Sequence, residues 1–323
     1  MPKHYGRKAY KGIGEKSMKI ALVSDIHLLA KTPINRIDNI LEDQWKKLEF
    51  VFKYCEDSNI ELLLQAGDFF DVPRNWDTLH KSILLLSDHY GVQTHSVFGQ
   101  HDMYMRNSEI VTNRIVLKEF GLIDVVQANH FLYEDSDIQI FGIDFQDDMN
   151  VDSIIKSLKL NRNKFHILVI HAGISDAPLY PGHEFSNAGI FLKKYPEFGL
   201  ILCGDIHKSF TIESKGRYIV NTGCMIRKNK DEYNLTHKPY FCVAEIVDRK
   251  IKGIETVYIP HTAKVFDQTE YIDTNSILDD FVSSISTPVL ANVNIYTAIH
   301  KFIKDNNLDP EVSTILSEVM INE

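Results

Sequence analysis

The sequence predicts an α/β fold in which helices cover both faces of a β-sheet. Short apolar runs recur over the first two thirds of the 323-residue chain, and amphipathic segments separate them. Runs that are apolar at nearly every position indicate strands buried on both faces. Strands that alternate with helices favour a sheet packed between helical layers. The expected strands lie within residues 18–25, 61–68, 93–102, 137–144, 165–173 and 200–208.

The spacing of apolar residues defines the helices. Between the first two strands, Trp45, Leu48 and Phe52 recur at steps of three and four residues, which places them on one face of a helix. Similar patterns predict helices near 77–90 and 108–119. After these elements, YFCVAEIVD and IKGIETVYI read as two strands of a hairpin that closes the domain near residue 260.

The same reading divides the chain into three parts: a basic flexible tail over 1–17, the main domain over 18–260 and a small helical segment over 261–323. In the last part, Asp309 and Pro310 are typical of a helix start. An apolar stripe follows, which either packs on the body or docks a partner. The stripe consists of Val312, Ile315, Leu316, Val319 and Met320.

Composition excludes several classes of protein. The net charge of −9 argues against a protein that coats DNA by charge alone, although it allows local contact with a phosphate backbone. No apolar run approaches the ~20 residues of a membrane span, and the first residues have no apolar signal region. The four cysteines show no CxxC spacing and are typical of reduced thiols in a cytoplasmic protein.

The leading tail differs in charge from the rest of the chain. It carries an excess of basic side chains, which either contact phosphate or remain solvated. These are Lys3, Arg7, Lys8, Lys11 and Lys16.

Five of the apolar runs end in a carboxylate, an imidazole or both. In open α/β sheets, ligands bind beyond the carboxyl ends of the strands, so residues far apart in sequence meet there. A shared cation explains such a gathering, because it gives clustered acids and imidazoles a common counter-charge. The residues are Asp25 with His27, Asp68, His101 with Asp102, His171, and Asp205 with His207.

The blocks SDIH, AGDFFD, GQHD, IHAG and GDIH resemble, in order, the five signature blocks of the calcineurin-like metallophosphoesterase superfamily. They cover roughly residues 18–225. Within it, AGDFFD and GQHD are similar to SbcD-type nucleases of double-strand-break repair, in a compact form typical of phage-encoded nucleases. The resemblance implies a sandwich of two β-sheets flanked by helices, with an abbreviated helical C-terminal appendage.

The resemblance also implies a two-metal phosphoesterase site. Asp68 would bridge two divalent cations that activate a water for in-line attack. His101 would assist the leaving oxygen, and Asp102 would set its tautomer. The implied ligands are Asp25, His27 and His207 for the first ion, and His171, Gln100 and Asp205 for the second.

Two of these residues depart from the family pattern, since Gln100 stands for the usual Asn and Asp205 for the usual His. Both departures fall on the second ion. If both side chains coordinate, the site has three oxygen ligands and one nitrogen, which favours Mn²⁺ or Mg²⁺ over Zn²⁺. The alternative is that the two changes cripple this site.

The function implied is a Mn²⁺-dependent DNA phosphodiesterase, an exonuclease with endonuclease activity as an option. Implied partners are DNA, an SbcC-type ATPase and a second copy of the chain, and no membrane is involved. The implied location is the cytoplasm, which would be that of a host cell if the protein is phage-encoded. Arg227, Lys228 and Lys230 either line a basic groove or lie on an exposed loop. The alternatives are a small-substrate phosphoesterase and a catalytically weak assembly subunit.

Overall fold

A computed structural model describes residues 17–146, 150–179 and 183–267. The elements below belong to one compact unit, which contains residues 17–178 and 184–267. Among the described residues, no helix combines the length and the apolar character that crossing a membrane requires. The apolar stripe predicted after Pro310 and most of the basic tail lie outside the described residues. The first strand begins at Ser17, one residue before the predicted boundary.

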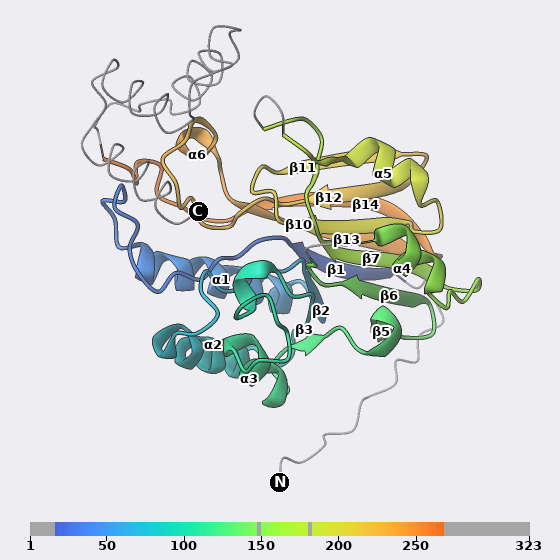
Figure 1. Ribbon diagram of the computed structural model, residues 1–323, viewed down its shortest axis with the longest axis horizontal. Coiled ribbons are helices and arrows are strands. Elements are labelled where there is room, and N and C mark those ends of the chain that lie inside the picture. Colours follow the sequence, from blue (N-terminus) through green and yellow to red (C-terminus); the bar gives the residue numbers. More distant parts are fainter. Residues whose placement is uncertain (1–16, 147–149, 180–182, 268–323) are drawn as a thin grey trace, which may run out of the picture. The chain divides into compact units, whose positions relative to one another are not determined.

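Two six-stranded sheets form the body of the unit (Figure 1). The first sheet has the order β14-β13-β1-β2-β3-β4. Strands β1 to β4 run parallel, and the hairpin β13–β14 adds to β1 in antiparallel fashion. The bounds are β1 Ser17–Val23, β2 Leu62–Gln65, β3 Gln93–Ser96, β4 Asp124–Val125, β13 Tyr240–Val247 and β14 Lys250–Tyr258.

The second sheet has the order β11-β12-β10-β7-β6-β5. Its four central strands are parallel, and the edge strands β11 and β5 are antiparallel to their neighbours. The bounds are β5 Phe131–Glu134, β6 Ile138–Ile143, β7 Phe165–His171, β10 Leu200–Gly204, β11 Phe210–Ser214 and β12 Arg217–Asn221. A separate short pair consists of β8 Ile174–Ser175 and β9 Ser186–Asn187.

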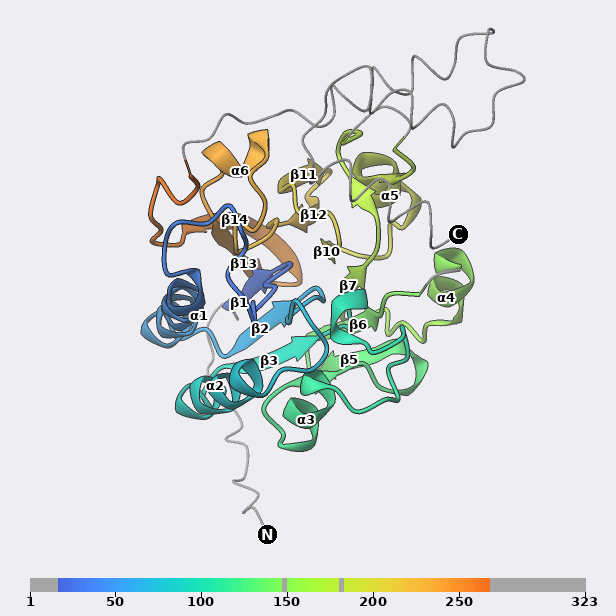
Figure 2. The same cartoon turned by 60° about the vertical axis from the view of Figure 1, so that its left-hand side comes forward.

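Helices cover the outer face of each sheet, as Figure 2 shows for α1, α2 and α3 beside β1, β2 and β3. These three helices pack on the first sheet, and α4 and α5 pack on the second. Helix α6 follows β12 in the chain. The bounds are α1 Ile40–Asp57, α2 Trp76–Asp88, α3 Asn113–Glu119, α4 Val151–Ser157, α5 Ala188–Lys194 and α6 Glu232–Thr236.

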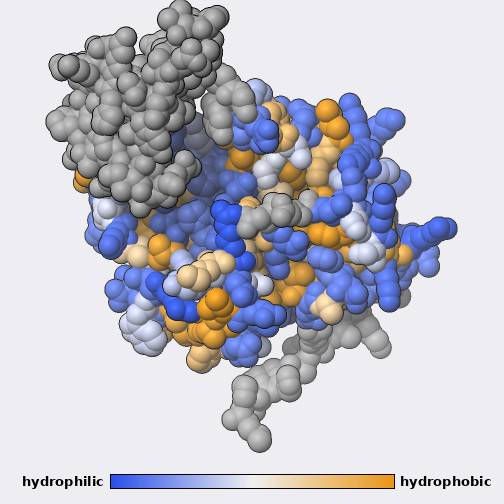
Figure 3. Space-filling view, viewed as in Figure 1, coloured by the Kyte–Doolittle hydropathy of each residue, from blue (hydrophilic) through white to orange (hydrophobic). Residues whose placement is uncertain are grey.

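Strand β1 shows why the apolar runs are nearly continuous. Ile20 and Leu22 face the core between the two sheets, whereas Ala21 and Val23 face the helices. All four side chains are buried, since successive strand residues point to opposite faces. The predicted sandwich of two sheets flanked by helices is therefore confirmed. The surface in Figure 3 is mainly hydrophilic with separate hydrophobic patches.

Candidate metal centre

The polar residues that follow five strands converge at one edge of the unit. Strands β1, β2 and β3 of the first sheet and β7 and β10 of the second bring them there. Three groups of side chains place their ligand atoms within 4.8 Å of one another. The groups are Asp25, His27 and His207; His27, Asp68 and His101; and Asp25, Asp68 and His171.

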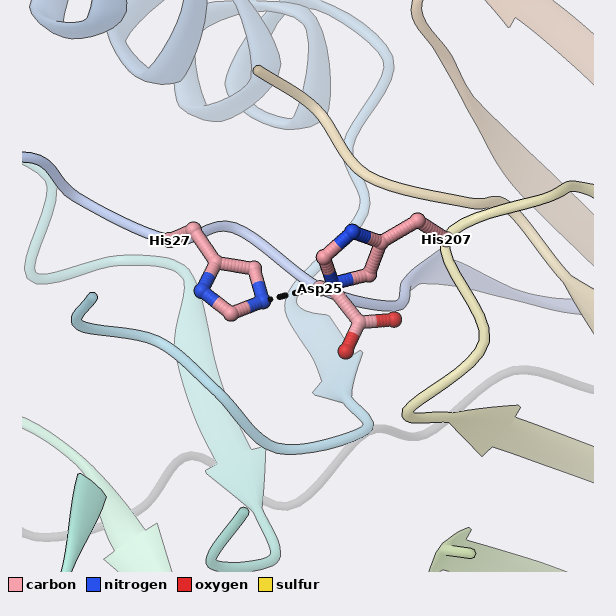
Figure 4. Close-up of side chains that lie close together, drawn as sticks. All are labelled: Asp25, His27 and His207. Atoms are coloured by element: carbon pink, nitrogen blue, oxygen red, sulfur yellow. Dashed lines mark hydrogen bonds between the residues drawn. The ribbon is translucent and has the colours of Figure 1, made fainter. Parts of the chain in front are cut away.

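The first group joins the ends of β1 and β10. The rings of His27 and His207 meet edge-on, with Nε2 atoms 3.0 Å apart, and Asp25 lies beside them (Figure 4). Asp25 is fully buried, and its Oδ2 has no hydrogen-bond partner among the described residues. Two imidazole nitrogens and a carboxylate oxygen within 4.8 Å of one another are a common divalent-cation ligand set.

His171 shows that the third group, which contains Asp25, Asp68 and His171, also needs a positive charge. Its Nδ1 lies 2.6 Å from the carbonyl oxygen of Ala66, so this nitrogen must carry the proton that is donated. On the other side, Nε2 lies 2.8 Å from Gln100 Oε1 and 3.5 Å from Asp68 Oδ2. Both of these atoms are acceptors. Nε2 therefore requires either a second proton or a cation among these oxygens.

The pKa of His171 reflects the same demand. Burial lowers it, but the hydrogen bond and the charge of Asp68 outweigh burial and raise the pKa of His171 to about 10. Burial raises the pKa of Asp25 well above its usual value. Burial and the neighbouring His27 lower the pKa of His207 to about 3. A divalent cation would offset the negative charge of the buried carboxylates of Asp25 and Asp68, and it would bind neutral imidazoles as ligands. The residues present thus fit such an ion.

Gln100 and Asp205, the two departures from the family pattern, contact each other here. Gln100 Nε2 donates a hydrogen bond to Asp205 Oδ1 at 2.8 Å, while Gln100 Oε1 faces His171. The glutamine side chain therefore bridges Asp205 and His171. Whether both side chains coordinate an ion stays a prediction.

The backbone holds these side chains in an unusual conformation. His27, Asp68 and Asp205 have φ of 50°, 51° and 96°, in the left-handed region. Such residues are costly and gather at functional sites, where the surrounding structure enforces them. The amide of His27 donates to the carbonyl of Asp68 at 2.9 Å, which ties the end of β1 to the end of β2.

Close packing explains the glycine of the GQHD block. A Cβ on Gly99 would clash with the carboxylate and the backbone nitrogen of Asp68. The turn after β3 therefore passes directly against the central carboxylate. In this position, the amide of His101 donates to Asp68 Oδ1 at 2.9 Å. Only a residue without a side chain allows this approach.

The predicted contact between Asp102 and the ring of His101 is wrong. Asp102 is fully buried and accepts hydrogen bonds from the amides of Phe69, Phe70 and Gly99. It also lies 3.8 Å from the guanidinium of buried Arg114. Asp102 thus holds the backbone of the loops after β2 and β3. The reason is geometric: adjacent residues in a tight turn direct their side chains to different sides.

Asp71, the last residue of AGDFFD, fills the role expected of Asp102. Its carbonyl oxygen lies 2.9 Å from His101 Nδ1 and accepts the proton of that nitrogen. Its carboxylate lies 3.4 Å from His27 Nδ1 and 2.6 Å from Lys228 Nζ. Burial raises the pKa of Asp71, but these two neighbours outweigh it and lower the pKa to about 2. The AGDFFD block contains Asp71, but the spacing of residues along the chain did not show that Asp71 contacts His101, His27 and Lys228.

Of the three basic residues expected in a groove, Lys228 contacts this site through Asp71. Arg227 is buried and donates to the carbonyl oxygens of Thr262 and Ala263. Lys230 Nζ lies 2.5 Å from Asp267 Oδ1. The expectation of a groove lined by Arg227 is therefore wrong, since that guanidinium satisfies backbone groups in the interior.

Comparison with known proteins agrees with this geometry. The family model described as calcineurin-like phosphoesterase matches residues 18–209. The uncharacterized metallophosphoesterase YkoQ of Bacillus subtilis (strain 168) is 24% identical over 220 residues, which is 66% of this chain and 70% of YkoQ.

Two solved structures resemble this chain at low sequence identity. The protein TT1561 of Thermus thermophilus has a TM-score of 0.47 and 14% identity, over 76% of this chain and 100% of that one. A putative 5'-nucleotidase from Staphylococcus aureus has a TM-score of 0.49 and 11% identity, over 83% of this chain and 58% of that one. Because the family model spans more than half of its residues and a candidate metal cluster lies at the strand ends, this chain belongs to the calcineurin-like phosphoesterases, hydrolases that use divalent metal ions.

Proposed function

We propose that this protein is a DNA phosphodiesterase that acts as an exonuclease with two divalent cations, Mn²⁺ being preferred. The observation that carries the proposal is the overlap of the three ligand groups. Asp25, His27 and Asp68 each belong to two of them. Side chains shared between neighbouring groups suit a pair of ions bridged by a carboxylate. Asp68 is the proposed bridge, because it lies between His27 and His171 at 3.5 Å from each.

The chemistry divides between the cations and the chain. When bound, two cations lower the pKa of a shared water and clamp the attacking and leaving oxygens of a phosphodiester. His101 donates a hydrogen bond from Nδ1–H to the carbonyl of Asp71, so Nε2 is the nitrogen that takes a proton from solvent and passes it to the leaving oxygen. Lys228, paired with Asp71 and partly exposed, supplies a cationic contact for a phosphate oxygen.

The DNA specificity rests on the similarity of AGDFFD and GQHD to SbcD-type nucleases. The same similarity supports DNA, an SbcC-type ATPase and a second copy of this chain as proposed partners, and the cytoplasm as the proposed location. A phosphoesterase for small substrates would use the same metal ligands, so only the choice of substrate distinguishes it from a DNA phosphodiesterase.

With Mn²⁺, we expect the protein to hydrolyse linear DNA and bis-p-nitrophenyl phosphate but not cyclic AMP. Hydrolysis of cyclic AMP but not of DNA would overturn the proposal.

The variant His101→Ala tests the assigned proton transfer. We expect kcat for bis-p-nitrophenyl phosphate to fall roughly 10²–10⁴-fold, the usual contribution of a general acid or base. Mn²⁺ binding, measured by isothermal titration calorimetry, is expected to persist because Asp68 and the other ligands remain. A catalytically weak assembly subunit would show no change in turnover, and that outcome would contradict an enzymatic role.

The variant Asp205→His tests the preference for Mn²⁺. It restores the histidine that is usual in the family and replaces one oxygen ligand by nitrogen. We expect the ratio of Mn²⁺-supported to Zn²⁺-supported activity to fall, since imidazole suits Zn²⁺ better than carboxylate does. Metal titrations of both proteins provide the measurement. Full activity of the wild type with Zn²⁺ and none with Mn²⁺ would exclude the preference.

A further inference from the structure

A strained two-residue turn follows the GQHD block directly. Tyr104 and Asn107 form an isolated antiparallel bridge, and the amide of Asn107 donates to the carbonyl of Tyr104 at 3.1 Å. The two residues between them, Met105 and Arg106, have φ of 50° and 53°. Turns with positive φ at both central positions usually contain Asn-Gly, because a side chain disfavours this backbone conformation. Here both positions carry long side chains.

The turn carries an aromatic ring, Tyr104, and one guanidinium group, Arg106, and the guanidinium of Arg74 lies over the ring. The guanidinium of Arg74 lies 4.6 Å from the centre of the Tyr104 ring, and its Nε donates to the carbonyl of Val111 at 2.9 Å. Tyr104 is 39% exposed. Arg74 therefore supports a ring that remains open to a ligand.

Arg106 lies near the third ligand group, which contains His171. Its guanidinium lies 5.6 Å from the ring centre of Phe145, and that ring lies 6.2 Å from the ring of His171. Asn or Gly at this position would favour the observed backbone but would remove the cation. Strain of this kind, retained beside a reaction centre, points to a functional demand on the side chain.

We propose that Tyr104 and Arg106, the two side chains of this turn that offer an aromatic ring and a cation, bind an unpaired nucleotide of single-stranded DNA next to the scissile phosphate. A nucleobase stacks on the Tyr104 ring that Arg74 supports, and Arg106 contacts the adjoining backbone phosphate. This inference rests on the proposed function and narrows its substrate class. Bases in a duplex are already stacked on their neighbours, whereas an unpaired base offers its face to an aromatic ring.

The first test compares two strands of equal length and charge. One is a 20-nucleotide thymidine strand, and the other carries abasic tetrahydrofuran units at every position. We expect the wild type to show a KM about tenfold lower for the thymidine strand, in line with the usual contribution of stacking on one aromatic side chain. Tyr104→Ala is expected to bring the ratio of the two KM values toward one, and Tyr104→Phe to restore it.

The second test separates the side chains from the backbone strain. Arg106→Gly is expected to raise the melting temperature, because glycine adopts positive φ freely, and to raise KM for both strands. Met105→Asn is the matched control: it also relieves strain and should raise the melting temperature while KM stays at the wild-type value. Equal KM values for wild type and Arg106→Gly would overturn the phosphate contact.

The outcomes distinguish this inference from the proposed function. If the wild type with Mn²⁺ fails to hydrolyse bis-p-nitrophenyl phosphate, the proposed function is wrong. If it hydrolyses DNA but does not distinguish thymidine from abasic strands, the inference alone is wrong. If Tyr104→Ala lowers the melting temperature and raises both KM values equally, the turn has a purely structural role and the inference is again overturned.

Discussion

Asp68→Ala is expected to lower kcat for phosphodiester hydrolysis by about 10³-fold or more. Asp68 belongs to two of the three ligand groups, and its Oδ1 accepts a hydrogen bond from the amide of His101 at 2.9 Å. Its loss would remove the proposed bridge between the ions and would free the turn that carries His101. Metal assistance is worth several kcal/mol, and each 1.36 kcal/mol corresponds to a factor of ten in rate. Steady-state kinetics with bis-p-nitrophenyl phosphate and Mn²⁺ provide the measurement.

The matched control is Asp68→Asn, which keeps an oxygen acceptor for the His101 amide and removes the charge. If activity depends on the negative charge of Asp68, both variants lose activity and both bind fewer than two Mn²⁺ ions by calorimetry. If activity depends instead on the hydrogen bond that holds the turn carrying His101, Asp68→Asn keeps most of the activity. Wild-type turnover in both variants would contradict a role for Asp68 in metal binding.

Asp102→Ala is expected to destabilise the protein by about 3–5 kcal/mol, because it leaves the buried guanidinium of Arg114 without its carboxylate partner. The amides of Phe69, Phe70 and Gly99 would lose their acceptor in the same step. Both Asp102 and Arg114 are fully buried, so water does not replace the lost contacts. Urea denaturation of the metal-free protein measures the change.

A double variant separates the ion pair from the hydrogen bonds. Combining Asp102→Ala with Arg114→Met removes both charges, and we expect it to recover part of the lost stability, as for other buried pairs replaced by apolar side chains. The unrecovered part reports the hydrogen bonds to the loop amides. A variant Asp102→Ala with wild-type stability and a selectively lower kcat would instead support a direct role of Asp102 on His101.

Local patterns were sufficient for most of the elements. The predicted strands are present, and so are the three helices predicted before residue 120. Helix α3 starts only at Asn113, because the preceding residues form the strained turn and the loop after it. The hairpin near residue 260 is also present, as β13 and β14. The hairpin β11–β12 and the helices α4 and α5 were not predicted. Each is short, so few positions carry a periodic signal.

The sequence by itself determined where the acids and imidazoles lie, because the carboxyl ends of parallel strands must share one edge of a sheet. That rule brought Asp25 and Asp68 together at the ends of β1 and β2. His171 lies at the end of β7 in the second sheet, so it joins them only because the two sheets pack against each other. Only the tertiary structure decided what each neighbouring side chain contacts. Asp102 accepts hydrogen bonds from backbone amides, and the carbonyl of Asp71 accepts one from His101. Arg227 donates to carbonyl oxygens in the interior. Hydrogen-bond partners depend on which loops cross in space, and the pattern of residues along one segment carries no information about the segment that crosses it.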